Sequence, residues 1–177
     1  MNIKAKYKVL MVIAPLVFIL DQLTKLAIIK YIPFGERISV IPGFFDIVHF
    51  RNTGAAFGMF SEMSDSFRIP FFYAIAVVAV IFLIIYYRSL KGDNLLMPVA
   101  LSLVFGGIAG NVIDRIRLGS VVDFLSVHIG DETLKFSFLE KAYDISLEWP
   151  AFNVADSAIT VSMFLFIFVA FFRKDCC

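Results

Sequence analysis

The sequence predicts an integral membrane protein, mainly α, with four transmembrane helices and a small β-structure outside the membrane. Hydrophobic residues occupy 60% of the 177 positions and charged residues 18%, and the mean hydropathy is +0.86. A soluble domain carries about 25% charged residues. The net charge of +1 argues against nucleic acid as a partner, because nucleic-acid-binding proteins present a basic patch or stripe.

The hydrophobic residues gather in four blocks, at about 9–29, 70–87, 95–113 and 152–172. Each block is close to the ~20 residues that a helix needs to cross a hydrocarbon core of ~30 Å. A backbone in lipid has to satisfy its own hydrogen bonds, so each block is predicted to be a helix. We expect the four helices to form one membrane domain over residues 1–177.

The first block follows three lysines, as the hydrophobic region of a signal peptide does. No small-residue cleavage site comes after it. Asp21, Gln22, Thr24 and Lys25 stand there instead. We therefore expect a retained transmembrane helix.

Positive charge predicts the orientation of the helices. Short segments on one side of the four crossings carry Lys4, Lys6, Lys8, Arg88, Lys91, Arg173 and Lys174. Lys and Arg collect in cytoplasmic segments of membrane proteins. Both termini are therefore predicted to be cytoplasmic, and segments 31–69 and 117–151 lie on the outer side.

The first outer segment contains a predicted β-structure at about 33–60. Two β-favouring runs, 38–41 and 44–50, are separated by Pro42 and Gly43. This pattern is typical of a small sheet. In the second outer segment, residues 132–149 mix apolar and charged residues, and both a short amphipathic helix and a hairpin fit them.

Polar residues of the predicted helices collect near the outer ends, and the inner halves contain almost none. Those expected to converge are Asp21, Asn52, Asn111, Asp114, Arg115, Asp123, Asn153 and Asp156. An ionisable residue at the middle of a membrane helix costs about 2.5–3.5 kcal/mol on insertion scales, so such residues indicate function. The pattern predicts a functional site at the outer surface.

Some of these residues also have structural interpretations. Asp21 and Lys25 are spaced i, i+4 and form a neutralising pair whose role, structural or functional, the sequence leaves open. Asp114 and Arg115 are interpreted as a structural ion pair. Gly106-x-x-x-Gly110 permits close helix approach and is expected to pack its helix within the monomer.

Asp123 and Asp156 have no neighbouring cation in the sequence, and both are expected at helix boundaries on the same face. They are either two solvated carboxylates or a catalytic dyad. In a dyad the two carboxyl groups share one proton. The ionised group then activates water, while the protonated group polarises a carbonyl and protonates the leaving amine.

Other catalytic groups are weakly indicated. His49 and His128 are isolated and no His-Glu-x-x-His occurs, so no metal or other cofactor is expected. Lys25 with Ser102 or Ser157 would make a Ser/Lys pair, but the spacing selects neither serine.

Two non-enzyme alternatives are a transporter that uses the acidic residues as a proton relay and a membrane assembly factor.

Five motifs carry a resemblance to the lipoprotein signal peptidase (signal peptidase II) family, and together they cover nearly the whole chain. They are Asp21-Gln22-Leu23-Thr24-Lys25, Arg51-Asn52-Thr53-Gly54-Ala55-Ala56-Phe57, Gly110-Asn111-Val112-Ile113-Asp114-Arg115, Val121-Val122-Asp123-Phe124 and Phe152-Asn153-Val154-Ala155-Asp156-Ser157.

The resemblance implies a multi-pass enzyme of the bacterial inner membrane with its active site at the periplasmic or extracellular face. Such an enzyme removes the signal peptide from diacylglyceryl-modified prolipoproteins, N-terminal to the modified cysteine, and globomycin-type peptides inhibit it. Membrane lipid is then a further partner. Asp123 and Asp156 match the catalytic dyad, and Arg51–Phe60 matches part of a substrate-holding β-cradle. The supporting residues implied are Asp21, Lys25, Asn52, Gly54, Asn111, Asp114, Arg115, Asn153, Ala155 and Ser157.

One feature departs from the family. Asp123 and Asp156 are 33 positions apart, which is longer than the usual spacing. The additional residues fall at about 128–149, within an outer loop at 119–150 where the family places a lid-like helix. Cys176 and Cys177 are adjacent, so no disulfide between distant segments is expected.

Overall fold

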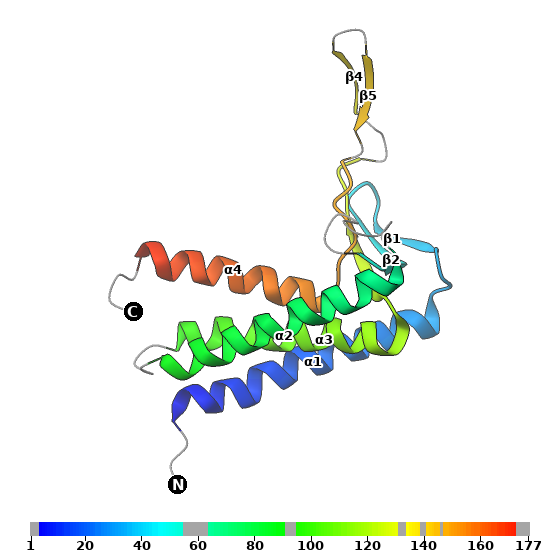
Figure 1. The fold of residues 1–177 in the computed structure, drawn as a ribbon. Helices are drawn as coiled ribbons and strands as arrows, with labels where there is room; N and C mark the ends of the chain where they lie inside the picture. Colours follow the sequence, from blue (N-terminus) through cyan, green and yellow to red (C-terminus); the bar gives the residue numbers. More distant parts are fainter. Residues whose placement is uncertain are drawn as a thin grey trace.

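The structure is a computed structural model that describes residues 4–54, 64–90, 95–130, 134–138, 141–145 and 147–172. Its helices are α1 (Ala5–Tyr31), α2 (Asp65–Ser89), α3 (Leu96–Leu118) and α4 (Val154–Phe172). In this part of the chain, four helices are long and apolar enough to cross a membrane. Figure 1 shows the helices side by side, with both termini at one end of the bundle and the strands at the other. The predicted fold class is confirmed.

The helices extend beyond the apolar blocks that predicted them. α3 continues past residue 113 through Asp114 and Arg115, because these side chains lie at the polar end of the bundle. Cys176 and Cys177, Lys91, Arg173, Lys174 and residues 55–60 of the predicted cradle lie outside the described residues.

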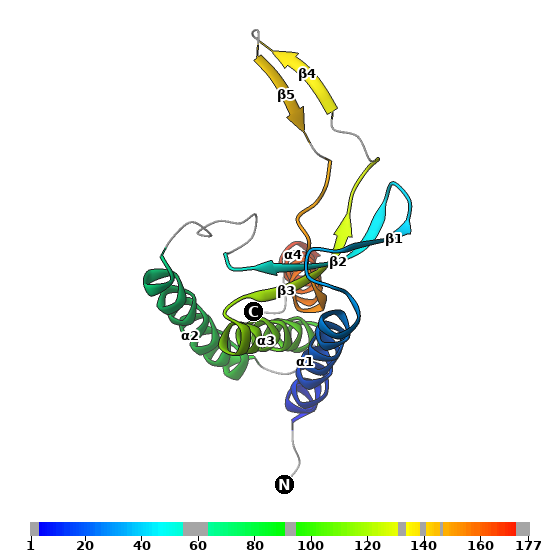
Figure 2. The same ribbon diagram turned by 90° about the vertical axis from the view of Figure 1, so that its right-hand side faces the viewer.

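Three glycines place α3 at the centre of the bundle, in contact with α1, α2 and α4 (Figure 2). A Cβ added at Gly106 would lie 2.7 Å from the carbonyl oxygen of Ala14 in α1. One added at Gly107 would lie 2.7 Å from the carbonyl oxygen of Ala155 in α4. The Gly106-x-x-x-Gly110 pattern therefore packs α3 within the monomer, since Gly110 also contacts Asp21 of α1.

α2 makes fewer contacts with the bundle, and most of its apolar side chains are exposed, including Val78 and Phe82. Near the chain termini it is joined to α1 by Lys6. The Lys6 ammonium group donates to the carbonyl oxygens of Tyr87, Arg88 and Leu90 at the end of α2, and the Tyr87 hydroxyl donates to the carbonyl of Lys6. A cation at a helix C-terminus satisfies carbonyl groups that have no partner within the helix.

A three-stranded antiparallel sheet covers the other end of the bundle, in the order β1 (Arg37–Ile41), β2 (Phe45–Asn52) and β3 (Val121–Val127). β1 and β2 confirm the sheet predicted from runs 38–41 and 44–50. β3 was not predicted, and the placement of Asp123 at a helix boundary was wrong. α3 ends at Gly119, whose φ of 70° turns the chain directly into β3.

The sheet is attached to the helices by an apolar cluster. Ile28 and Ile32 at the end of α1 pack with Val122 and Phe124 of β3, and Val154 at the start of α4 lies against them. Because β3 carries Asp123 between Val122 and Phe124, burial of these two neighbours fixes the strand over the ends of α1 and α4.

The second outer segment forms a hairpin. β4 (Leu134–Phe138) pairs with β5 (Lys141–Ile145) in antiparallel register, with Phe136 opposite Tyr143. The hairpin extends away from the sheet and the bundle (Figures 1 and 2). Of the two structures that fitted residues 132–149, the described residues adopt the hairpin, and the lid-like helix implied by the resemblance is absent from them.

The close α3–α4 contact predicts the effect of adding a methyl group there. Gly107→Ala should lower the stability of the folded protein by about 1–3 kcal/mol, because a backbone carbonyl cannot move away as a flexible side chain would. Thermal unfolding of the detergent-solubilised protein measures this loss. Ala109→Leu, at an exposed position of the same helix, is the control and should leave Tm nearly unchanged. Equal Tm values for Gly107→Ala and wild type would contradict the packing.

Candidate active site

A cavity of about 570 Å³ opens where the sheet meets α3 and α4. Its wall combines polar and apolar side chains from four parts of the chain. They are Asn52, Asn111, Arg115, Val121, Asp123, Trp149, Pro150, Ala151, Phe152, Asp156, Ser157, Ile159, Thr160 and Val161. Both aspartates of the predicted dyad are among them.

Asp123 reaches the cavity from β3 and is only 3% exposed. Opposite it, β2 contains an irregularity: Ile47 pairs with Leu125, and the next pair joins Phe50 to Asp123, so β2 has one extra residue. Such a bulge bends the strand and re-aims nearby side chains. The bulge in β2 therefore lies directly beside the position of Asp123 in β3.

Asp156 belongs to the first turn of α4, and Asn153 caps that helix. The Asn153 amide oxygen accepts a hydrogen bond from the Asp156 backbone N–H at 3.0 Å, and the Asp156 carboxylate accepts one from the Asn153 backbone N–H at 3.2 Å. This reciprocal arrangement is a capping box. The Asn153 side-chain amide also donates to Asp123 at 2.8 Å, so one residue contacts both aspartates.

Asn111 of α3 holds Asp156 from another side. Its amide nitrogen donates to the Asp156 carboxylate at 2.8 Å. Its amide oxygen accepts a hydrogen bond from the Lys25 ammonium group at 3.0 Å. Because ammonium is a donor only, this contact fixes which end of the Asn111 amide faces Asp156.

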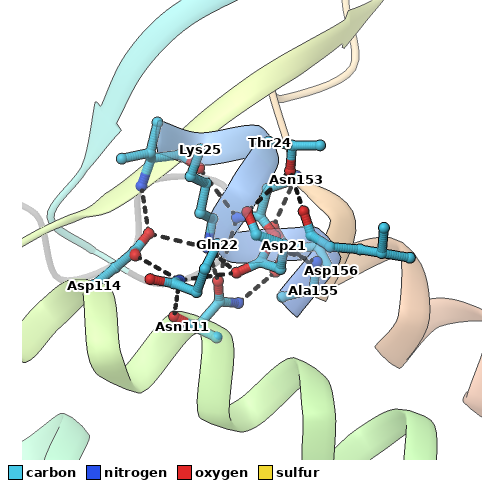
Figure 3. A network of polar contacts seen from close by, with 12 residues as sticks. Asp21, Gln22, Thr24, Lys25, Asn111, Asp114, Asn153, Ala155 and Asp156 are labelled. Carbon is cyan, nitrogen blue, oxygen red and sulfur yellow. Dashed lines mark hydrogen bonds and ion pairs between the residues drawn. The ribbon is translucent and has the colours of Figure 1, made fainter. Parts of the chain in front are cut away.

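Lys25 lies at the centre of a buried polar network (Figure 3). Its ammonium nitrogen is 2.9 Å from an oxygen of Asp21 and 2.9 Å from an oxygen of Asp114. The other oxygen of Asp21 accepts the backbone N–H of Ala155 at 3.0 Å, which joins α1 to α4. Asp114 thus pairs with Lys25 of another helix, and its expected pairing with Arg115 is not the one the structure forms.

Arg115 connects α3 to the end of β2 and to α2. Its guanidinium group donates to the carbonyl oxygen of Gly54 at 3.0 Å and lies over the ring of Phe72, 4.8 Å from its centroid. The backbone N–H of Gly54 donates to the side chain of Asn52. Arg115 therefore brings a fixed positive charge to the cavity and holds the turn that carries Asn52.

The environment of Asp123 raises the pKa of its carboxyl group to about 7. Burial is the main cause, and the nearby charge of Asp156 acts in the same direction. Hydrogen bonds from Asn52 and Asn153 lower the pKa but do not cancel these two effects. Asp123 is therefore partly protonated at neutral pH, and the protonated form can act as a general acid.

All twelve predicted site residues lie in or directly behind the cavity, in two layers. Those that line it are Asn52, Asn111, Arg115, Asp123, Asp156 and Ser157. Asn153, Asp21, Lys25 and Asp114 are buried behind them, whereas Gly54 and Ala155 contribute backbone contacts.

The sequence did not reveal the cavity wall formed by Trp149–Phe152, nor the role of Gln22. The Gln22 amide donates to Asp114 and to the carbonyl oxygen of Gly110. The available signal for Gln22 was its place in the first of the five family motifs, Asp21-Gln22-Leu23-Thr24-Lys25. For Trp149–Phe152, the direct continuation into Asn153 was the available signal.

Known proteins resemble this chain over most of its length. Residues 13–172 match the family described as signal peptidase (SPase) II. The lipoprotein signal peptidase of Syntrophotalea carbinolica is 45% identical, over 90% of this chain and 88% of that protein. That of Geobacter metallireducens is 40% identical, over 92% and 90%.

The structure resembles that of a bacterial membrane enzyme determined by the in meso method at 2.3 Å resolution. The TM-score is 0.77 at 33% sequence identity, and the match covers 99% of this chain and 97% of the other. Taken with the buried pair of aspartates, these similarities show that the chain belongs to the signal peptidase II family of aspartic-type peptidases.

Proposed function

We propose that this peptidase removes the signal peptide from diacylglyceryl-modified prolipoproteins, cutting N-terminal to the modified cysteine with Asp123 and Asp156 as catalytic residues. The observation that carries the proposal is that both carboxyl groups line one cavity at the end of the bundle opposite the termini. With both termini cytoplasmic, this end faces the periplasm or extracellular space of the bacterial inner membrane.

The two aspartates have different surroundings and take different roles. We assign the shared proton to Asp123, whose pKa of about 7 leaves part of the molecules protonated at neutral pH. Asp156 accepts hydrogen bonds from Asn111 and from the Asn153 backbone, and an ionised carboxylate is an acceptor only. In this assignment Asp156 is the base and Asp123 the acid.

The reaction needs no group beyond water and the dyad. Asp156 takes a proton from water as the hydroxyl oxygen bonds to the scissile carbonyl carbon, which the proton of Asp123 polarises. The C–N bond then breaks, and the leaving amine receives the proton of Asp123. Proton transfer from Asp156 to Asp123 restores the starting state.

The cavity suits a substrate that is partly embedded in lipid. Ile159 and Val161 continue its wall along α4, away from the sheet and toward the membrane interior. Acyl chains of the substrate can therefore stay in the bilayer while the scissile bond reaches the dyad. Burial of acyl chains at about 0.8 kcal/mol per CH₂ holds the substrate in the membrane. The cavity then has to recognise only a short peptide motif. Globomycin-type peptides would compete for this cavity.

The Ser/Lys alternative conflicts with the contacts of Lys25. Its described contacts are with Asp21, Asp114 and Asn111, and none of them is with a serine hydroxyl. The hydroxyl of Ser102 donates to the carbonyl of Pro98 within its own helix. A transporter is disfavoured because the acidic side chains described within the helices, Asp21, Asp114 and Asp156, all belong to the one network around Lys25 (Figure 3), so they do not form a proton path along the bundle.

Replacing either aspartate should abolish catalysis. Asp123→Asn and Asp156→Asn are each expected to lower kcat for a purified diacylglyceryl-modified prolipoprotein by at least about 10³-fold, because acid and base act as one unit. Mass spectrometry of the product locates the cut. Glu36→Gln, the same change of carboxylate to amide at an exposed position outside the cavity, is the control and should retain most of the turnover. Near-normal turnover of either Asp variant would exclude the dyad.

The raised pKa of Asp123 predicts how pH changes the activity of wild type and the stability of Asp123→Asn relative to wild type. As the pH rises through about 7, Asp123 loses its proton, so kcat/KM should fall on the alkaline side. A free aspartate ionises near pH 3.9. Between about pH 3.9 and 7 the unfolded chain has lost this proton and the folded protein still binds it, so the folding stability of wild type falls as the pH rises through this range. Asp123→Asn stays neutral, and its gain in Tm over wild type should be larger at pH 8 than at pH 4.5. An equal difference at both values would contradict the raised pKa.

Lys25 is predicted to be needed for folding as well as for alignment of Asp156. Lys25→Met leaves two buried carboxylates without a cation and should cost about 3–5 kcal/mol of stability. Lys30→Met removes an exposed lysine of the same helix and serves as the matched control. Thermal unfolding in detergent compares the two, and similar Tm values would show that Lys25 does not hold the network together.

A further inference from the structure

The segment from Leu147 to Phe152 returns along the edge of β3 that does not pair with β2, and two isolated bridge pairs, Leu125 with Phe152 and His128 with Glu148, join it there. The backbone N–H of Trp149 donates to Val127, and Phe152 exchanges two hydrogen bonds with Leu125. Trp149, Pro150, Ala151 and Phe152 then form one wall of the catalytic cavity. We name this segment, Trp149–Phe152, the return wall.

Glu148 precedes the return wall and forms a bridge pair with His128 of the strand beside it. One oxygen of its carboxylate accepts hydrogen bonds from Arg37 at 2.5 Å and from the hydroxyl of Ser126 at 2.7 Å. Successive side chains of a strand point to opposite faces, so these contacts lie on the face opposite Trp149.

Arg37 extends the contact across the sheet. Its guanidinium group also donates to the Asp46 carboxylate of β2 at 2.6 Å, and Asp46 is 3.0 Å from the imidazole of His128. The chain of contacts therefore runs from β1 through β2 and β3 to the residue that precedes the return wall. We name the four residues Arg37, Asp46, His128 and Glu148 the sheet network.

The two ends of the sheet network differ in strength. The Asp46 side chain is 4% exposed, whereas the side chains of Glu148 and Arg37 are 35% and 37% exposed. Exposed ion pairs are weaker than buried ones because water screens them. Burial alone would raise the pKa of Glu148, but hydrogen bonds from Arg37 and Ser126 hold it below its usual value. The ion pair next to the return wall, Arg37 with Glu148, is thus the more exposed and weaker pair of the network.

The sheet network does not touch the dyad. None of its four residues lines the cavity, and the described contacts of Asp123 and Asp156 come from Asn52, Asn111 and Asn153. Loss of Glu148 contacts should therefore alter the return wall and leave the spacing of the two aspartates unchanged.

We propose that Glu148, held by Arg37 and Ser126, is a positioning residue that fixes the return wall for substrate binding. The inference rests on the proposed function and deepens it, since it assigns one side of substrate recognition to the outer sheet. Trp149 is 61% exposed at the cavity, and a rigid aromatic ring there can contact a lipid-modified peptide at the membrane surface.

The chain carries one tryptophan, so its fluorescence reports on the return wall directly. In detergent micelles, Glu148→Ala and Arg37→Ala should lower the fluorescence anisotropy of Trp149, because each removes the side-chain contact between Arg37 and Glu148 and leaves the segment held by its backbone hydrogen bonds to β3. Glu148→Gln keeps an acceptor for Arg37 and Ser126 and should retain most of the anisotropy. Glu36→Ala removes an exposed carboxylate next to Arg37 and should change nothing. Unchanged anisotropy in Glu148→Ala overturns the proposal.

Kinetics with a diacylglyceryl-modified peptide give the second readout. Glu148→Ala should raise KM about tenfold with kcat and its pH profile nearly unchanged, and Glu148→Gln should restore KM. Glu148→Ala combined with Trp149→Ala should raise KM no more than Trp149→Ala alone, because both act on the same wall. An unchanged KM, or additive effects of the two substitutions on KM, overturns the positioning role.

The two proposals fail in different ways. Absence of cleavage by wild type would reject the proposed function, whereas the anisotropy measurement needs no cleavage and tests the positioning role by itself.

Discussion

The ammonium group of Lys25 is the contact on which the rest of the membrane domain depends. It lies 2.9 Å from Asp21, 2.9 Å from Asp114 and 3.0 Å from Asn111, and Lys25 is 1% exposed. Three charged groups so deeply buried are stable only if none of them loses its partners. α1 and α3 therefore have to approach closely, and this requires the glycine at position 110 beside Asp21. Helix packing and the polar network each require the other.

The same network supplies the alignment of the dyad. Lys25 fixes the amide of Asn111, and Asn111 in turn donates to Asp156. On the other side, Asn153 caps α4 and donates to Asp123. Because Asn153 both caps α4 and donates to Asp123, the first turn of α4 cannot shift without changing the dyad. A burial that raises the pKa of Asp123 is tolerated because these amides leave its carboxyl group with partners.

Much of the fold and most of the site could be predicted from sequence, and the differences have physical causes. Four apolar blocks predicted four helices because the bilayer sets their length. Pro42 and Gly43 marked the turn between β1 and β2. β3 follows α3 after only Gly119 and Ser120, and because its residues are buried on both faces, no alternating pattern marked it as a strand. Asp114 pairs with Lys25 because adjacent residues of a helix do not face each other, which a pairing with Arg115 would need. The Trp149–Phe152 wall depends on pairing with β3, and such nonlocal hydrogen bonds leave no local pattern.

The pairing of the return segment also explains how the chain accommodates 33 positions between its two aspartates. The chain leaves the sheet after β3 and comes back beside it, with Ile129 bonded to Leu147 and Val127 to Trp149. These bonds pair the two ends of the inserted segment with each other. Residues between 130 and 147 therefore lengthen the loop without displacing β3 or the Trp149–Phe152 segment. The entropic cost of a longer loop grows only slowly with its length. The separation of Asp123 and Asp156 is therefore set by the paired segment and the Asn153 cap, and a projecting hairpin is compatible with an intact dyad.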